Sequence, residues 1–260
     1  MNRVILCMAF VAGISSLQAQ VRIGGRTINL KKVEEAAKDV VSTVSLSDED
    51  VAALCRETVE WMDANNPIAD ETSEYGARLA RLTANMKEAN NIPLNFKVYD
   101  VDDVNAFACG DGSIRIFSAL MDLMEDDELV AVIGHEIGHI AGTDTKDAIR
   151  TAYMSSAAIH AVGAASNAVY ALSETQLKDL VQSFVGAQFS QKQEYAADDY
   201  GFNISIAHGF GPYAMANALD KLVDLSQSSR ASAVRKMFAS HPDSEKRAER
   251  IRKKADSYAK

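Results

Sequence analysis

The chain has 260 residues, of which 47% are hydrophobic, and a formal net charge of −9 at pH 7. This length allows one large domain or two small ones, and the hydrophobic share is sufficient for a real core. The acidic balance argues against nucleic acid as a partner, and the sequence contains no visible internal repeat.

The first residues have the pattern of an export signal. Arg3 supplies a positive start, an apolar stretch runs to Ile14, and small or polar residues lead to Ala19. This pattern predicts a secretory signal peptide over residues 1–19. The apolar stretch is too short to span a bilayer. Because Ile14 stands where a lipid-modified cysteine would be needed, we expect a periplasmic protein that is not a lipoprotein.

Removal of the signal peptide leaves two cysteines, Cys55 and Cys109. An even pair in an exported protein favours a disulfide. The alternative is two separate buried thiols. A disulfide would tie a helix near the N-terminus to the strands described below.

Helical spacing of apolar residues marks the first part of the chain. It extends over residues 29–44 and 51–62, and from Thr72 to about Ala89. Ser47 and the acids after it predict a helix N-cap. We therefore expect an N-terminal helical extension at residues 20–45, followed by one domain over residues 46–260.

The apolar period then changes from helical to alternating. Residues 96–101 read as a short strand, and Gly110-Asp111-Gly112 joins two further alternating segments, which predicts a hairpin. The edge of such a sheet can hold an extended peptide through main-chain hydrogen bonds. A short helix from Ser118 to about Met124 follows.

His135-Glu136-Ile137-Gly138-His139 lies in an apolar stretch that Asp126-Asp127-Glu128 opens as a helix. Residues four apart share one helix face, so His135 and His139 can bind the same metal ion. Zinc accepts nitrogen and oxygen ligands tetrahedrally, and a catalytic site keeps one position for water. Glu136 can take a proton from that water. Chance is the competing explanation, but isolated imidazoles on a buried helix are costly. We predict one zinc ion here.

An Ala-rich stretch from Thr151 to Leu172 is long enough for a membrane span, but its weak apolarity favours a buried or partly exposed helix. The next helix, expected from Leu177 to about Tyr200, carries Glu194 and Asp198 four residues apart. Glu194 can complete a His, His, Glu ligand set. Asp198 can orient a ligand imidazole or donate a proton. A solvated acidic helix face is the competing interpretation.

The C-terminal part reads as a helix from Pro212 to Leu225, a polar loop over residues 226–233 and a final helix. His241-Pro242 precedes that last helix, and Asp243 or Ser244 can cap it.

These motifs together resemble the zinc endopeptidases that include the CAAX prenyl proteases, the heat-shock protease HtpX and small periplasmic proteases of bacterial envelope quality control. The resemblance covers roughly residues 46–255. The matching stretches are Asn105–Ala108, Ser113–Leu120, His135–His139, Glu194–Asp198 and His241-Pro242.

The resemblance implies an α+β fold, mostly helical and of the zincin type, with a small β-sheet before the zinc helix. It implies that His135, His139 and Glu194 bind zinc and that Glu136 is the base. Asp198 matches a position often assigned as proton donor. His241 matches a histidine that can approach the zinc and close the site, although a helix-cap histidine explains it equally well.

We therefore expect an exported zinc metalloendopeptidase that cleaves misfolded or misassembled cell-envelope proteins. Its partners would be unfolded protein substrates, with peripheral association with the membrane or with outer-membrane proteins as a further expectation. The alternative is a latent protein that binds clients while His241 keeps the site closed. A structural zinc site is disfavoured because it needs no base beside the metal. The sequence does not indicate the oligomeric state.

Overall fold

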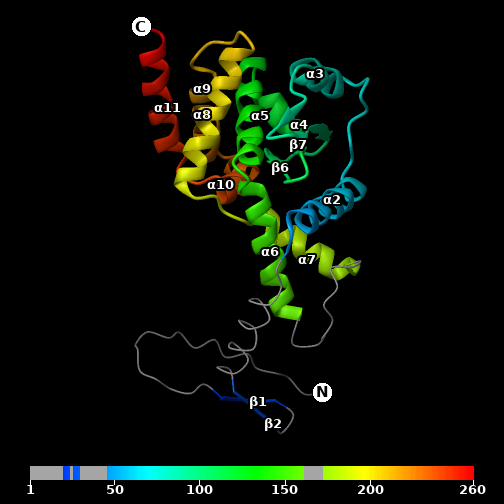
Figure 1. Ribbon diagram of the computed structural model, residues 1–260. Helices are drawn as coiled ribbons and strands as arrows, with labels where there is room; N and C mark the ends of the chain where they lie inside the picture. The colour runs from blue at the N-terminus through cyan, green and yellow to red at the C-terminus, as the bar shows by residue number, and fades with distance from the viewer. Residues whose placement is uncertain (1–19, 24–25, 30–45, 161–171) are drawn as a thin grey trace.

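The computed structural model describes residues 20–23, 26–29, 46–160 and 172–260, and side chains within residues 46–154 and 172–260. The described chain is mostly helical with small sheets, which confirms the expected α+β class. Helix α5 (Asp126–Ala141), which carries the His-Glu-x-x-His motif, lies at the centre (Figure 1). On one side of it lie α8 (Gln191–Ala207), α9 (Ala214–Ser226) and α11 (Ser244–Tyr258). On the other side lies a sheet with the short helices α3 (Glu74–Thr83) and α4 (Ser118–Leu123).

The sheet beside α5 has three strands in the order β5-β7-β6, with β7 parallel to β5 and antiparallel to β6. The strands are β5 (Asn95–Tyr99), β6 (Ala106–Ala108) and β7 (Ser113–Phe117). The central strand β7 is buried from Ser113 to Ile116. The hairpin expected at Gly110-Asp111-Gly112 is confirmed. Gly112 has a φ of 94°, and a Cβ there would lie 2.0 Å from the carbonyl oxygen of Pro93.

Helices α5 and α8 approach each other closely because both carry small residues at their contact. A Cβ on Gly138 would lie 2.9 Å from the Cα of Ala197. A Cβ on Gly201 would lie 2.5 Å from the carbonyl oxygen of Ala131. Larger side chains at these positions would push the helices apart. The small residues therefore set how near the residues of α8 come to the histidines of α5.

A second group of helices forms its own core cluster. It consists of α2 (Asp48–Asn65), α6 (Asp144–His160) and α7 (Glu174–Val185). The predicted N-cap of α2 is confirmed, since the Ser47 side chain accepts from the Asp50 amide in a capping box. Helix α6 begins within three residues of the end of α5, and this places its first turn beside the histidines.

Cys55 of α2 and Cys109, just after β6, lie together in this second core cluster. Both are free thiols, so the expected disulfide is not formed in the structure. The Sγ of Cys109 instead lies 3.9 Å from the carbonyl oxygen of Cys55. Burial and the contact with Cys55 raise the pKa of the Cys109 thiol well above its ordinary value, and this disfavours the reactive thiolate.

The expected helix from Thr72 to Ala89 ends earlier than predicted. Helix α3 stops at Thr83, and a short hairpin of β3 (Glu88–Ala89) and β4 (Ile92–Pro93) follows. Asn90 and Asn91, which read as a helix end, have φ values of 50° and 61°. Two consecutive residues at positive φ form the tight turn of a hairpin, and Asn tolerates that conformation.

The helix expected from Leu177 to Tyr200 is also divided in two. Helix α7 ends at Val185 with Gly186 as its C-cap, and α8 begins after Ser190, whose side chain caps the Gln193 amide. Helix α8 then continues to Ala207. The polar segment after α9 contains the short 3₁₀ helix η1 (Ala231–Val234), and α10 (Arg235–Ser240) follows it.

The described part of the expected helical extension at residues 20–45 consists of two paired strands, β1 (Gln20–Ile23) and β2 (Arg26–Asn29). This corrects the prediction for these residues, whose alternating pattern favours strands. The helix expected over residues 29–44 falls almost entirely outside the described residues, as do residues 1–19. The limits of the main domain, 46–260, stay a prediction. The Ala-rich stretch from Thr151 is helical to His160, and no described helix has the length and apolarity of a membrane span.

Candidate metal centre and active site

The motif residues lie on α5 as predicted, and His135, Glu136 and His139 are all buried. The helix begins after Glu125, which forms a capping box with Glu128, and three acids occupy its first turn. The side chains of Glu194 and Asp198 on α8 contact these histidines, and both are fully buried. The competing interpretation of these acids as a solvated helix face is therefore wrong.

Four ligand-type side chains converge at this point: His135, His139, Glu194 and His241. The Nε2 atoms of His135 and His139 are 3.1 Å apart, and the Oε1 of Glu194 lies 3.3 Å from His139 Nε2. The Nδ1 of His241 lies 3.3 Å from His135 Nε2 and 3.0 Å from Glu194 Oε1. Tetrahedral coordination at zinc–nitrogen distances of about 2.0–2.1 Å separates the ligand atoms by roughly 3.3 Å. The four donor atoms therefore fit a tetrahedral metal site.

The Nδ1 atoms of His135 and His139, which are not among the converging donor atoms, each contact a carboxylate. His135 Nδ1 lies 3.0 Å from Asp198 Oδ1, and His139 Nδ1 lies 2.9 Å from Asp144 Oδ2. Asp144, in the first turn of α6, itself accepts a hydrogen bond from Gln193 at 2.8 Å. A metal-binding imidazole is neutral, and these carboxylates favour the tautomer with the proton on Nδ1, which leaves the lone pair of Nε2 for the metal. A cation between the two rings would accept both lone pairs.

The balance of charge at the site also favours a cation. Four carboxylates are buried there, and the only buried guanidinium among the described residues around them is that of Arg247. Arg247 binds Asp198 with two nitrogens, at 2.9 and 2.6 Å, and pairs with Glu194 through Nη1. The carboxylates are Glu136, Asp144, Glu194 and Asp198. The excess of negative charge suits a divalent ion.

The pKa values follow from the same contacts. Burial lowers the pKa of His135, although its hydrogen bond to Asp198 acts in the opposite direction. Burial also lowers the pKa of His139, but Asp144 and Glu194 outweigh it and raise that pKa to about 9. Burial raises the pKa of Asp198, but Arg247 outweighs it and lowers that pKa to about 2. The contact of Asp198 Oδ1 with His135 Nδ1 at 3.0 Å suits this carboxylate to orient the ring, and its role as a proton donor stays a prediction.

Two carboxylate oxygens of the site, Glu136 Oε1 and Glu194 Oε2, are buried and make no hydrogen bond to the described residues. Glu194 Oε2 is paired with Arg247, whereas Glu136 Oε1 lies 3.7 Å from His241 Nε2. Glu136 faces a small cavity whose walls include β6 and Phe189, and the ring of Phe189 stacks on His139 with centroids 4.0 Å apart. An unpartnered buried carboxylate is costly unless it serves a substrate or a water molecule. This is the environment that a general base requires.

All the predicted motif residues of the site therefore come together, whereas Cys55 and Cys109 lie in the core cluster of α2, α6 and α7. The sequence reasoning missed Asp144, Gln193 and Arg247. Asp144 follows the motif by five residues and Gln193 precedes Glu194. Arg247 follows His241 by six residues, which places it one turn inside the last helix. A search for polar residues within one helical turn of each proposed ligand would have found Gln193 but neither Asp144 nor Arg247.

Comparison with known proteins identifies the family. The profile of peptidase family M48 matches residues 72–255, more than half of the chain. The chain is 37% identical to the metalloprotease LoiP of Escherichia coli (strain K12) over 235 residues, 90% of this chain and 92% of that protein. It is 35% identical to the metalloprotease YcaL of the same organism over 209 residues, 80% of this chain and 81% of that protein.

A more distant relative is the beta-barrel assembly-enhancing protease of Yersinia pestis, 28% identical over 253 residues. The match covers 92% of this chain but 51% of that protein, so the chain spans about half the length of this relative. The matched family region contains every residue of the buried ligand group. The chain belongs to peptidase family M48 and is a metalloprotease.

Proposed function

We propose that the metal is zinc, held by His135, His139 and Glu194, and that the protein is an endopeptidase. The observation that carries this proposal is the convergence of two carboxylate-oriented imidazoles and one carboxylate oxygen at separations close to tetrahedral. Nitrogen and oxygen donors in a four-coordinate arrangement are typical of zinc. When bound, the metal polarises the scissile carbonyl and lowers the pKa of water.

The protein's own residues then have distinct roles. Glu136, buried and unpartnered at Oε1, takes the proton of the attacking water and passes it to the leaving amine. Asp198 and Asp144 hold His135 and His139 in the tautomer that directs Nε2 to the metal. The free edge of β6 lines the cavity at Glu136, and an extended peptide can pair with it through the main chain.

We further propose that the protein is exported to the periplasm and cleaves misfolded or misassembled envelope proteins. The signal-like pattern of residues 1–19 supports export. The name of the more distant relatives, beta-barrel assembly-enhancing protease, supports a role near outer-membrane proteins. Association with such proteins or with the membrane belongs to the same proposal.

His241 favours a second candidate function, that of a latent protease which mainly binds clients. Its Nδ1 lies 3.0 Å from Glu194 and its Nε2 lies 3.7 Å from Glu136, so it stands between the ligands and the base. A histidine that binds the metal as a fourth ligand would take the position that water needs. His241→Ala separates the two functions, since a closed protease gains activity and a pure binder does not.

The test is casein cleavage by the zinc-loaded chain from Gln20 onward, compared with Glu136→Gln and His241→Ala, with zinc counted in each. We expect Glu136→Gln to keep its zinc and lose cleavage by at least about 10³-fold, because the proton has no acceptor. Full activity of Glu136→Gln would contradict the assigned base. Zinc in all three proteins with cleavage in none would favour the client-binding function.

A further inference from the structure

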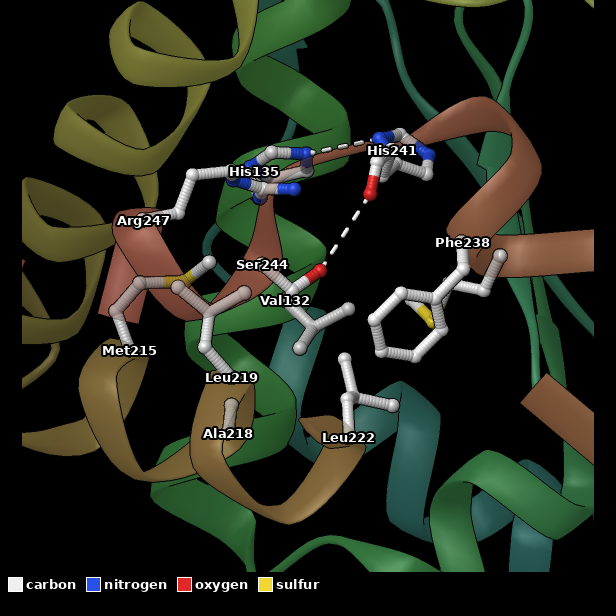
Figure 2. A pocket seen from close by; sticks show the side chains of 11 residues that line it. Val132, His135, Met215, Ala218, Leu219, Leu222, Phe238, His241, Ser244 and Arg247 are labelled. Carbon is white, nitrogen blue, oxygen red and sulfur yellow. Dashed lines mark hydrogen bonds between the residues drawn. The ribbon is translucent and has the colours of Figure 1, made fainter. Parts of the chain in front are cut away.

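The two histidines of the motif differ in what holds them. Figure 2 shows Arg247 beside His135, at one end of a cavity lined by apolar side chains of α5, α9 and α10. Arg247 binds Asp198, and Asp198 in turn contacts His135 Nδ1. His139 is not among the residues that line this cavity. Within the described part of the chain, no arginine or lysine pairs with Asp144, the carboxylate that contacts His139.

A neutral side chain takes the place of the arginine at His139. The Oδ2 of Asp144 lies 2.9 Å from His139 Nδ1, and its Oδ1 accepts a hydrogen bond from Gln193 Nε2 at 2.8 Å. Among the described residues, no other side chain hydrogen-bonds this carboxylate. An aspartate carboxylate rotates easily about its bond to Cβ, so the second hydrogen bond fixes its plane relative to the imidazole ring. Gln193 therefore acts on His139 through Asp144.

The oxygen of the same carboxamide holds the beginning of α8. Gln193 Oε1 accepts hydrogen bonds from the amide and the hydroxyl of Ser190, at 2.8 and 2.7 Å, as part of a capping box. Phe189, directly before Ser190, stacks on the His139 ring with centroids 4.0 Å apart. The ring is thus held at its edge by Asp144 and on its face by Phe189. Gln193 bonds to the first of these residues and to the neighbour of the second.

A second capping box shows what the cap alone requires. Helix α7 begins with the same Ser-x-x-Gln arrangement, in which Gln176 Oε1 accepts from the amide and the hydroxyl of Ser173 at 3.0 and 2.9 Å. None of the hydrogen bonds between described residues is donated by the Gln176 carboxamide. A glutamate forms a capping box as a glutamine does. The cap of α8 therefore does not explain the Nε2 donor of Gln193.

We propose that Gln193 is a positioning residue of the protease, which holds the zinc ligand His139 through Asp144 and needs a carboxamide to do so. The inference rests on the proposed zinc ligands. A carboxamide offers a donor and an acceptor at the end of one side chain, and here Asp144 uses the donor while Ser190 uses the acceptor. A carboxylate at residue 193 would keep the cap but repel Asp144, and this would draw Asp144 away from the ring.

Two substitutions separate the two halves of the carboxamide. Gln193→Glu keeps the acceptor for Ser190 and loses the donor to Asp144, whereas Gln193→Lys keeps a donor and loses the acceptor. We expect zinc affinity, measured against a competing chelator, to fall about tenfold in Gln193→Glu and by less than about threefold in Gln193→Lys. The added charges act in the opposite direction, because a carboxylate attracts a cation and an ammonium group repels it.

A merely structural role of Gln193 predicts the reverse order. Loss of the cap should lower the unfolding free energy more in Gln193→Lys than in Gln193→Glu, and urea unfolding of the metal-free proteins measures this. Co²⁺ can take the zinc site, and its visible absorption spectrum depends on the geometry of its ligands. The spectrum should change in Gln193→Glu. Gln176→Glu is the matched control, because it makes the same substitution in the cap of α7, and it should leave the zinc affinity and the Co²⁺ spectrum unchanged.

The outcomes separate the role of Gln193 from the zinc ligands. Zinc affinity no lower in Gln193→Glu than in Gln193→Lys would overturn the positioning role and leave the ligands in place. An equal fall in Gln176→Glu would also overturn it, since the effect would then come from helix capping in general. His139→Ala tests the ligands themselves and should lose zinc affinity by more than about 100-fold, the upper end for an outer partner of a ligand. Wild-type affinity in His139→Ala would overturn the proposed ligands and the role of Gln193 with them.

Discussion

Arg115 and Arg247 are the two buried arginines among the described residues, and each binds an aspartate with two nitrogens. Arg115 of β7 holds Asp63 of α2 at 2.8 and 3.0 Å. Arg247 of α11 holds Asp198 of α8 at 2.9 and 2.6 Å. The two ion pairs have the same local geometry but lie in different electrostatic surroundings.

Around Arg115 the positive groups are in excess. Asp63 also accepts hydrogen bonds from Lys97, at 2.7 Å, and from the hydroxyl of Tyr99, at 2.7 Å. Arg115 in addition donates to the carbonyl oxygen of Asn95 at 3.2 Å. These contacts join Asp63 of α2 to two strands of the sheet. This pair therefore serves the fold.

Around Arg247 the negative groups are in excess. The guanidinium contacts Asp198 and the Oε2 of Glu194, while the Oε1 of Glu194 faces His139 at 3.3 Å. Arg247 thus fixes the carboxylate that orients His135 and leaves one oxygen of Glu194 to face the metal site. A buried ion pair with a surplus of acid can thus hold a ligand set in place, whereas one with a surplus of positive charge holds only the fold together.

Replacement of Arg247 should have the largest effect. Arg247→Gln leaves Glu194 and Asp198 without their cation, so we expect zinc affinity to fall about 10- to 100-fold and casein cleavage to fall with it. The variant should also lose about 3–5 kcal/mol of stability, as buried pairs do when one partner is removed. Zinc affinity measured against a competing chelator checks the first effect. Zinc affinity equal to that of the wild-type protein would contradict the role assigned to Arg247.

Arg115→Gln is the matched variant for the other pair. It should lose stability of the same order, about 3–5 kcal/mol, because Asp63 is left in a partly buried site with fewer partners. Its folded fraction should bind zinc as tightly as the wild-type protein. Urea unfolding and the chelator competition measure the two quantities separately. A comparable fall in zinc affinity for both variants would contradict the claim that only the Arg247 pair supports the metal site.

The pH dependence of stability should show the smallest effect. Burial raises the pKa of Asp63, but hydrogen bonds from Arg115, Lys97 and Tyr99 outweigh it and lower that pKa to about 2. A depressed pKa contributes stability that is complete above the unfolded value of about 3.9 and is lost as pH falls toward 2.

For this partly exposed carboxyl the contribution is about 1–2 kcal/mol after allowance for solvent screening. The difference in unfolding free energy between the wild-type protein and Asp63→Asn should therefore narrow between pH 5 and pH 2. Urea unfolding at several pH values measures this difference, and a constant difference over that range would contradict the shifted pKa.

The sequence predicted the parts of the site that follow from spacing within one helix. His135 with His139, and Glu194 with Asp198, are pairs four residues apart, and the helical period places each pair on one face. The small sheet was also predictable, because alternating segments around Gly110-Asp111-Gly112 are a local signal.

The missed residues depend on how separate helices meet. Asp144 reaches His139 only because α6 begins within a few residues of α5, and Arg247 reaches Asp198 only because α11 packs beside α8. The break between α7 and α8 was missed because helical residues on both sides made Gly186 read as an interior residue. Contacts between separate helices produce no periodic pattern of residues in the sequence.

The most direct test of the metal site is a crystal structure of the zinc-loaded protein with anomalous scattering measured at the zinc edge. The account predicts one peak, about 2.0–2.2 Å from the Nε2 atoms of His135 and His139 and from Glu194 Oε1. A zinc ion bound by other residues, or no peak between these three atoms in zinc-loaded crystals, would contradict the account.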